Sequence, residues 1–197
     1  MTHLTFQRIS QDYLTRLKAA IDVIPEEPLE RLAEALAAAW RSNRQVFLFG
    51  NGGSAGNAIH LANDYLYGVS GKLGNALRVT ALPANSAVLT CLANDEGYDN
   101  VYVGQLAVLA QPGDLAIAFS GSGNSPNILK ALEYCSANKI DSFAILGYAG
   151  GDAKLLANTV VHVPVDDMQI SEDIQLIIGH LLMQWLRINQ KNNLVDA

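Results

Sequence analysis

Five short, mostly apolar runs, separated by stretches with helical periodicity, set the pattern of this chain. Continuous apolar runs of this kind are typical of strands buried on both faces of a parallel sheet. The runs expected to form strands cover residues 46–49, 78–82, 115–119, 142–146 and 160–163. The pattern predicts an α/β protein with a flavodoxin-like five-stranded parallel sheet flanked by helices, in the order 2-1-3-4-5. Its ligand is expected at the carboxyl ends of the strands, beside the first one.

Apolar residues spaced three and four apart predict the helices. The expected helices cover residues 6–24, 29–40, 87–93, 101–109, 126–137 and 169–189, with one more beginning at Ser54 and a short one after 147–151. The first two, interrupted by Pro25 and Pro28, precede the first strand and are not required by a doubly wound sheet. Two interpretations stay open: they cover one face of the sheet, or they pack against another subunit.

Composition and charge narrow the function classes. Half of the 197 residues are hydrophobic and 16% are charged, as expected for one globular domain. The net charge of −6, without a Lys/Arg cluster, argues against nucleic-acid binding, although an anionic metabolite could still bind to backbone N–H groups. Cys91 and Cys135 show no pairing pattern, and the chain has neither a signal-peptide pattern nor an apolar run of the roughly 20 residues that a membrane span needs. We therefore expect a cytoplasmic protein without a membrane segment.

The glycine turn after the first strand is the first candidate site. The turn is Gly50-Asn51-Gly52-Gly53, and Ser54 stands where a helix N-cap is expected. A strand, a glycine turn and a helix N-terminus together present N–H groups and a helix dipole that favour an anion such as phosphate. The glycine spacing is not the dinucleotide-binding pattern, and the P-loop lysine is missing. Alternatively, the glycines serve only tight packing.

A second polar turn, residues 120–125, lies between the third strand and a helix. It offers the hydroxyl groups of Ser120, Ser122 and Ser125 together with Asn124, and its glycines let the backbone curl around a phosphate. The alternative is an ordinary helix cap, which Ser125 alone would provide. Since neither turn contains Lys or Arg, recognition by neutral donors would suit a sugar monophosphate better than a nucleoside triphosphate.

Two acid–histidine pairs form the third candidate site. His60 and Asp64 are four residues apart, and Glu172 and His180 are eight apart, so each pair shares one face of a helix. If the two helices meet, the four side chains make a site suited to Zn²⁺ or another divalent ion. A lone helical histidine is more often a core or interface residue, and spacing alone does not show that the helices meet.

The runs GNGGSAGNAIHLAND and SGSGNSPNILKAL, with the final helix that carries His180, resemble the SIS (sugar isomerase) domain family. Within that family the likeness is greatest to isomerases of sedoheptulose 7-phosphate, and it extends over nearly the whole chain. The resemblance implies a single domain over residues 1–197, with an N-terminal helical pair at 1–42 and an α/β core at 45–197. It also implies a homotetramer whose active sites use residues of neighbouring subunits.

The resemblance assigns roles to the candidate residues. Asp64 and His180 match the family's catalytic pair. The sugar phosphate is expected at Asn51, Gly52, Gly53, Ser54, Asp95, Ser120, Ser122, Asn124 and Ser125. Some members bind zinc at the positions of His60, Asp64, Glu172 and His180.

Three positions depart from the family's pattern. Asp64 replaces a glutamate, which draws the carboxylate back by roughly 1 Å. Glu172 replaces a glutamine and adds a negative charge that favours a divalent cation. Gln169 stands where the family tends to have an acidic residue. Because all four positions of the metal site keep liganding groups, we interpret the site as rebuilt rather than lost.

The sequence therefore leads to an aldose–ketose isomerase acting on a phosphorylated sugar, with sedoheptulose 7-phosphate as the expected substrate. Asp64 is expected as the base and His180 as its acid partner in an enediol(ate) mechanism, with or without a metal. The resemblance suggests heptose supply for a cell-surface polysaccharide. Two alternatives are an isomerase of another sugar phosphate and a non-catalytic protein of the same fold that binds a replication initiator.

Overall fold

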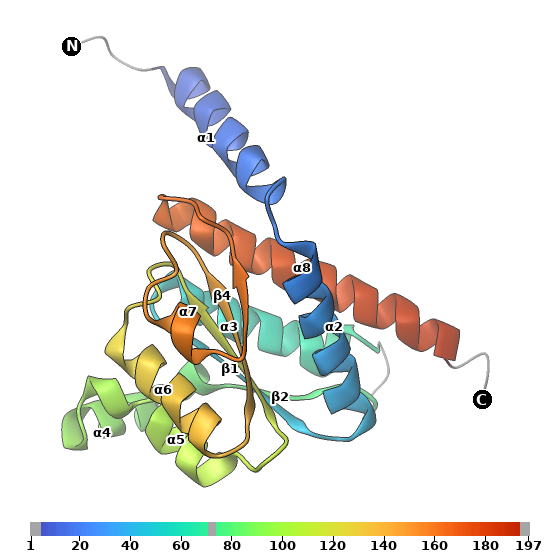
Figure 1. The fold of residues 1–197 in the computed structure, drawn as a ribbon, viewed down its shortest axis with the longest axis vertical. Coiled ribbons are helices and arrows are strands. Elements are labelled where there is room, and N and C mark those ends of the chain that lie inside the picture. The colour runs from blue at the N-terminus through green and yellow to red at the C-terminus, as the bar shows by residue number, and fades with distance from the viewer. Residues whose placement is uncertain (1–4, 71–73, 194–197) are drawn as a thin grey trace.

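The computed structural model describes residues 5–70 and 74–193 (Figure 1). Within this part of the chain five parallel strands form one sheet in the order β2-β1-β3-β4-β5, which confirms the predicted fold class and strand order. The strands are β1 Gln45–Gly50, β2 Arg78–Ala81, β3 Leu115–Ser120, β4 Asp141–Leu146 and β5 Thr159–His162.

Helices cover both faces of the sheet. Successive side chains along each strand point to opposite faces, so the protein has two hydrophobic cores, one on each side of the sheet. On β1, Val46 and Leu48 enter one core, and Phe47 and Phe49 enter the other. The first core lies under α2 (Glu26–Arg41), α3 (Gly53–Asn63) and α8 (Met168–Asn193). The second lies under α4 (Ser86–Asp95), α5 (Val103–Leu109), α6 (Pro126–Ala137) and α7 (Ala153–Leu156), with short 3-10 turns at Leu82–Ala84 and Tyr98–Asn100.

The helix α1 (Phe6–Ile21) projects away from this body, as Figure 1 shows. α1 contacts α8 and the segment just before α8, and we call this contact the α1 foothold. The Tyr13 hydroxyl donates to Asp173 Oδ2 at 2.5 Å, and Arg16 forms an ion pair with Asp167. α2, in contrast, packs against the sheet, so the two N-terminal helices have different surroundings.

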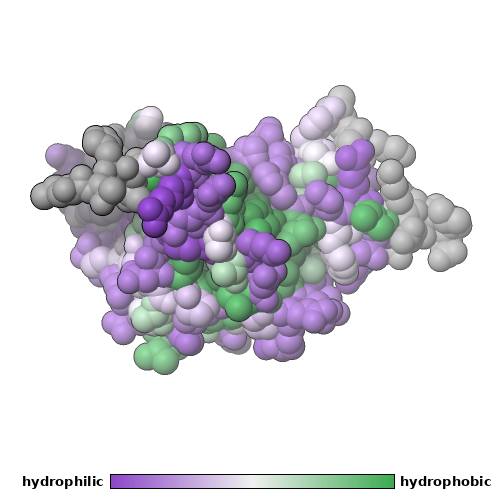
Figure 2. All heavy atoms as spheres, turned by 90° about the horizontal axis from the view of Figure 1, so that it is seen from above, coloured by the Kyte–Doolittle hydropathy of each residue, from purple (hydrophilic) through white to green (hydrophobic). Residues whose placement is uncertain are grey.

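Apolar surface gathers on the face from which α1 projects (Figure 2). Large exposed apolar side chains occur on both α1 and α8: Phe6, Ile9, Leu14, Ile21, Leu181, Trp185 and Ile188. Such a patch is typical of a surface that another protein covers.

Several expected helix ends were wrong. α1 ends at Ile21 rather than residue 24, with Asp22 as its C-cap. α2 begins at Glu26 rather than residue 29, because Pro28 lies in its first turn, where a helix does not need the missing N–H. α4 spans Ser86–Asp95 rather than residues 87–93, so Asn94 and Asp95 lie inside the helix. α8 extends from Met168 to Asn193, beyond the expected range 169–189.

Among residues 5–70 and 74–193, no helix has both the length and the apolar character needed to cross a membrane.

Candidate functional site

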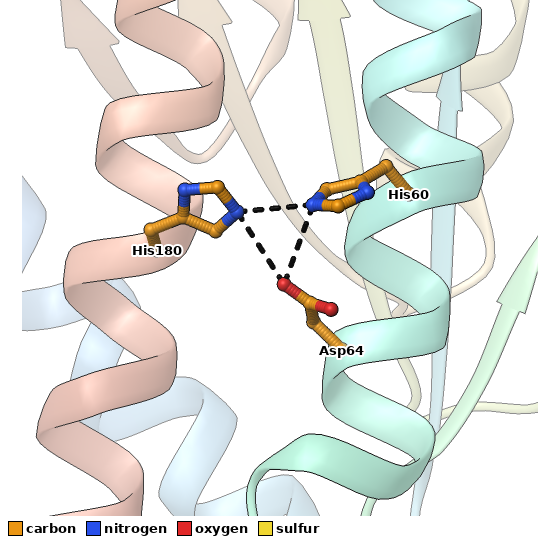
Figure 3. A group of neighbouring side chains, drawn as sticks. All are labelled: His60, Asp64 and His180. Atoms are coloured by element: carbon orange, nitrogen blue, oxygen red, sulfur yellow. Dashed lines mark hydrogen bonds and ion pairs between the residues drawn. The ribbon is translucent and has the colours of Figure 1, made fainter.

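His60, Asp64 and His180 converge between α3 and α8, with their side chains pointing toward one another (Figure 3). His60 Nε2 lies 3.0 Å from His180 Nε2. Asp64 Oδ2 lies 3.5 Å from His60 Nε2 and 3.4 Å from His180 Nε2. We call these three residues the His–Asp–His cluster. The helix with His60 and Asp64 and the helix with His180, which the sequence did not show to be neighbours, therefore do meet.

The helices meet because Gly179 removes a side chain at their crossing. A Cβ at Gly179 would overlap the buried Leu61 side chain, so a larger residue there would force Leu61 or the helix to shift. Tyr65, buried one turn after Leu61, donates its hydroxyl to the Gly179 carbonyl at 3.0 Å. Gly179 directly precedes His180 and was the sequence signal that we missed.

A local change of helix type occurs at Asp64. α3 continues there as a π-helical segment, Asp64–Gly68, in which Val69 N donates to Asp64 O at 3.1 Å. Single π turns inside helices are frequent at functional sites. The Asp64 side chain is 20% exposed, against 50% for His60 and 41% for His180, so the cluster faces solvent in the single chain.

The donor set of the His–Asp–His cluster fits a divalent metal. Two imidazole nitrogens and a carboxylate oxygen are zinc ligands, and three protein ligands leave one position open for water or substrate. Ligands around a tetrahedral zinc lie roughly 3.3 Å from one another. The three separations within the cluster, 3.0, 3.4 and 3.5 Å, are close to that value.

Glu172, the fourth expected ligand, lies outside this cluster. Its carboxylate packs against Gly53 so closely that a Cβ at position 53 would overlap it. Gly53 begins α3, seven residues before His60, which corresponds to about 10 Å along the helix. The structure thus brings together three of the four predicted ligands and leaves Glu172 beside the glycine turn.

The glycine turn differs from the prediction at its cap. α3 begins at Gly53 with Gly52 as its N-cap, so the expectation that Ser54 caps this helix was wrong. Gly52 has φ +56°, a left-handed conformation that favours glycine over Ser. Ser54 is buried within the first turn of the helix. Ala55 N in that turn donates to the Gly52 and Asn51 carbonyls, at 3.1 and 3.3 Å, whereas the N–H groups of Gly53 and Ser54 have no partner within their own helix.

The glycine turn and the serine turn are joined by a pair of amides. Asn51 Nδ2 donates to Asn127 Oδ1 at 2.8 Å, and Asn127 Nδ2 donates back to Asn51 Oδ1 at 2.9 Å. Tyr98 and Tyr102 also donate their hydroxyls to Asn51 Oδ1, at 3.1 and 3.3 Å. Tyr102 shares its single hydroxyl hydrogen with the Gly50 carbonyl, which lies closer than Asn51 Oδ1, and burial raises the pKa of Tyr102 above the usual value. Nothing in the sequence pattern pointed to a role for Asn127, Tyr98 or Tyr102 in this site.

The serine turn keeps hydroxyl hydrogens available for a ligand. Ser120 Oγ accepts a bond from Gly123 N at 2.9 Å, and Ser122 Oγ accepts one from Asn124 N at 3.3 Å. Because these oxygens accept from the backbone, their own O–H groups stay free to donate. Ser125 occupies the N-cap position of α6 without making a side-chain cap bond, so its hydroxyl is not used as an ordinary cap.

Two further residues expected to bind substrate already have partners in the chain. Asn124 Oδ1 accepts a bond from Asp152 N at 3.0 Å. Asp95, the exposed last residue of α4, accepts bonds from the Asn94 amide at 2.7 Å and from the Cys91 thiol at 3.4 Å. These two bonds, that of Asn94 first, lower the pKa of the Asp95 carboxyl. The bond to Asp95 raises the pKa of the Cys91 thiol.

Comparison with known proteins gives a consistent result. A family model described as the SIS domain matches residues 11–147. The phosphoheptose isomerase of Sulfurimonas denitrificans is 34% identical over 154 residues, which cover 78% of each chain. The phosphoheptose isomerase of Chlorobaculum parvum is 33% identical over 174 residues, 87% of this chain and 83% of that one.

Solved structures agree on the fold. A phosphoheptose isomerase from Francisella tularensis superimposes with a TM-score of 0.85 at 22% identity, covering 94% of this chain and 99% of the other. The enzyme of the same name from Neisseria gonorrhoeae gives a TM-score of 0.82 at 24% identity, covering 91% and 97%.

Proposed function

Because this chain belongs to the SIS domain family, and within it to the phosphoheptose isomerases, we propose that it interconverts sedoheptulose 7-phosphate and D-glycero-D-manno-heptose 7-phosphate. The observation that carries this proposal is the convergence of His60, Asp64 and His180. An aldose–ketose isomerisation needs a base and an acid that face the same two carbons, and a carboxylate with two imidazoles can supply both.

In this proposal the phosphate of the sugar binds at the carboxyl ends of β1 and β3. The hydroxyls of Ser120, Ser122 and Ser125 donate to it. Gly50 pairs with Phe119 in the sheet, so the two turns begin side by side. Neutral donors hold the phosphate and fix the far end of the open-chain sugar, which aligns its carbonyl end for reaction.

Asp64 and His180 perform the proton transfers in the proposed mechanism. Asp64 removes the proton from the carbon next to the carbonyl, and the resulting enediol(ate) takes a proton back at the neighbouring carbon. His180 serves as the acid partner for the substrate oxygens. His60, which contacts both groups, helps to keep them in place.

A zinc ion held by His60, Asp64 and His180 would supply a Lewis acid that polarises the sugar carbonyl and hydroxyl oxygens. Asp64 and His180 would then act partly as ligands rather than as free acid–base groups. Glu172 adds negative charge beside Gly53, near the start of α3, where a helix dipole stabilises it. We assign the metal to the three-residue set, with Glu172 as a neighbour outside it.

We further propose a cytoplasmic homotetramer in which neighbouring subunits cover the exposed His–Asp–His cluster. Two helices present surface for such contacts. α1 projects from the body with exposed apolar side chains, and α4 contains no buried residue. Covering the cluster would exclude water from the reacting carbons. The pathway consistent with this activity is heptose supply for a cell-surface polysaccharide.

The test is isomerisation of sedoheptulose 7-phosphate by the purified protein, after metal removal and again with Zn²⁺ restored. Turnover that is lost and returns with zinc supports the metal-assisted form. Turnover that does not depend on zinc supports Asp64 and His180 as free acid–base groups. Absence of turnover in both conditions contradicts the proposed function and directs the search to another sugar phosphate, and then to a non-catalytic role.

A further inference from the structure

A loop outside the candidate site supports the serine turn from behind. This loop, residues 147–152, connects β4 to α7, and we call it the supporting loop. At its start, Gly147 N donates to the carbonyls of Ser120 and Gly121, at 3.3 and 3.1 Å. The first hydrogen bonds of the supporting loop therefore hold the beginning of the serine turn.

The end of the supporting loop and the first residue of α7 hold the other half of the serine turn. Ala153 N donates to the Gly123 carbonyl at 2.9 Å, and Asp152 N donates to Asn124 Oδ1 at 3.0 Å. A Cβ on Gly123 would overlap the carbonyl group of Gly150, so the two backbones are in direct contact. Since the contact is backbone against backbone, a displacement of one loop displaces the other.

The supporting loop contains a strained residue. Tyr148 has φ +40°, a left-handed conformation that is unfavourable for a bulky side chain. Such a conformation persists only when its surroundings hold it. One bond that does so runs from Tyr148 N to the Val165 carbonyl, at 3.1 Å. The other involves His162.

His162, the last residue of β5, connects the supporting loop with α7. Its Nε2 lies 2.9 Å from the Tyr148 carbonyl oxygen, and its Nδ1 lies 3.3 Å from Lys154 Nζ. A carbonyl only accepts, so Nε2 carries the hydrogen, and Nδ1 accepts from the lysine. His162 is thus oriented from both sides, and its Nε2–H group is aimed at the strained residue.

We propose that His162 is a positioning residue for phosphate recognition. Its hydrogen bond to Tyr148 keeps the supporting loop in the shape that sets the hydroxyls of the serine turn. The inference rests on the proposed function of that turn, but His162 itself touches neither the phosphate nor the reacting carbons.

The experiment compares His162→Leu with His162→Gln. Leucine fills a similar volume and donates nothing, whereas glutamine can place an N–H group near the position of Nε2. We expect inorganic phosphate to bind roughly fivefold more weakly to His162→Leu, as for the loss of one hydrogen bond, and nearly normally to His162→Gln. With sedoheptulose 7-phosphate, KM should rise by the same factor in His162→Leu while kcat stays unchanged. Hydrogen exchange at Gly123 and Ala153 should be faster only in that variant.

Three results would overturn the inference: phosphate affinity of His162→Leu equal to that of the wild type, equal losses in both variants, or a fall in kcat at constant KM. If His162→Leu does not fold, His162→Asn takes its place, because its shorter amide cannot reach Tyr148. A wild-type protein that binds phosphate but does not isomerise the sugar contradicts the proposed function and leaves the comparison of phosphate affinities valid. A wild-type protein that binds no phosphate overturns the inference itself.

Discussion

His60 Nε2 and His180 Nε2 lie 3.0 Å apart although 120 positions separate the two residues in the sequence. Their rings meet edge to face, with centroids 5.2 Å apart. One helix brings each of them to this point, and Gly179 allows the two helices to approach. The geometry of the cluster therefore depends on Gly179, a residue without a side chain that could take part in the reaction.

Replacing Gly179 by alanine should disturb both stability and activity. The added methyl group would overlap the buried Leu61 side chain, so either Leu61 or α8, which carries His180, must shift. We expect a loss of about 1–3 kcal/mol in the free energy of unfolding, measured by denaturant titration, together with a clear fall in turnover.

The matched control is Gly56→Ala. Gly56 also lies inside a helix, but no atom of the described residues outside its own helix turn lies within 4 Å of a Cβ at that position. Alanine is the better helix former, so this variant should gain up to about 1 kcal/mol in stability. Equal losses in the two variants would mean that the crossing at Gly179 is not the cause.

A second prediction separates a binding serine from a capping residue. Ser125→Ala should weaken phosphate binding with little change in melting temperature, because Ser125 makes no side-chain cap bond. Asn85→Ala should do the reverse and cost about 1 kcal/mol of stability, because Asn85 Oδ1 accepts the cap bond from Val88 N at 3.2 Å. Phosphate titration and thermal unfolding of both variants give the comparison. A large fall in melting temperature for Ser125→Ala would assign that serine to the cap.

A third prediction concerns the foothold of α1. The hydrogen bond to Asp173 raises the pKa of Tyr13 from 10.0 to about 12. Since the folded-state pKa lies above the unfolded value, the protonated phenol stabilises the fold fully below pH 10, and this contribution is lost as the pH rises toward 12. The difference in tyrosinate absorbance between wild type and Tyr13→Phe should therefore titrate near 12. A midpoint at the ordinary tyrosine value would show that Tyr13 does not donate to Asp173 in solution.

The sequence predicted the sheet well because buried parallel strands have a distinct signal. Continuous apolar runs such as the one before Gly50 identify the strands, and their spacing by helices identifies parallel connections. Helix ends were harder to predict. Pro28 looked like an interruption, yet it lies in the first turn of α2, where proline fits.

Only part of the site could be predicted from the sequence, because local spacing does not specify which helices pack together. The i, i+4 spacing of His60 and Asp64 fixes their common face, but nothing local specifies which helix packs against it. Glu172 shares a helix with His180, and two turns of that helix carry it to Gly53 instead. The tertiary pairing of Asn51 with Asn127 lay beyond sequence reasoning for the same reason, since amides that bond across 76 positions have no local pattern.

The most direct test of the central claim is the rate of sedoheptulose 7-phosphate isomerisation by wild type, Asp64→Asn and His180→Gln, measured at equal concentrations of folded protein. Both substitutions keep the size of the side chain and remove its acid–base chemistry. We predict turnover by the wild type and a fall of about 10²-fold or more in each variant, with melting temperature and subunit assembly unchanged. Variants that convert the sugar as fast as the wild type would contradict the assignment of the reaction to the His–Asp–His cluster.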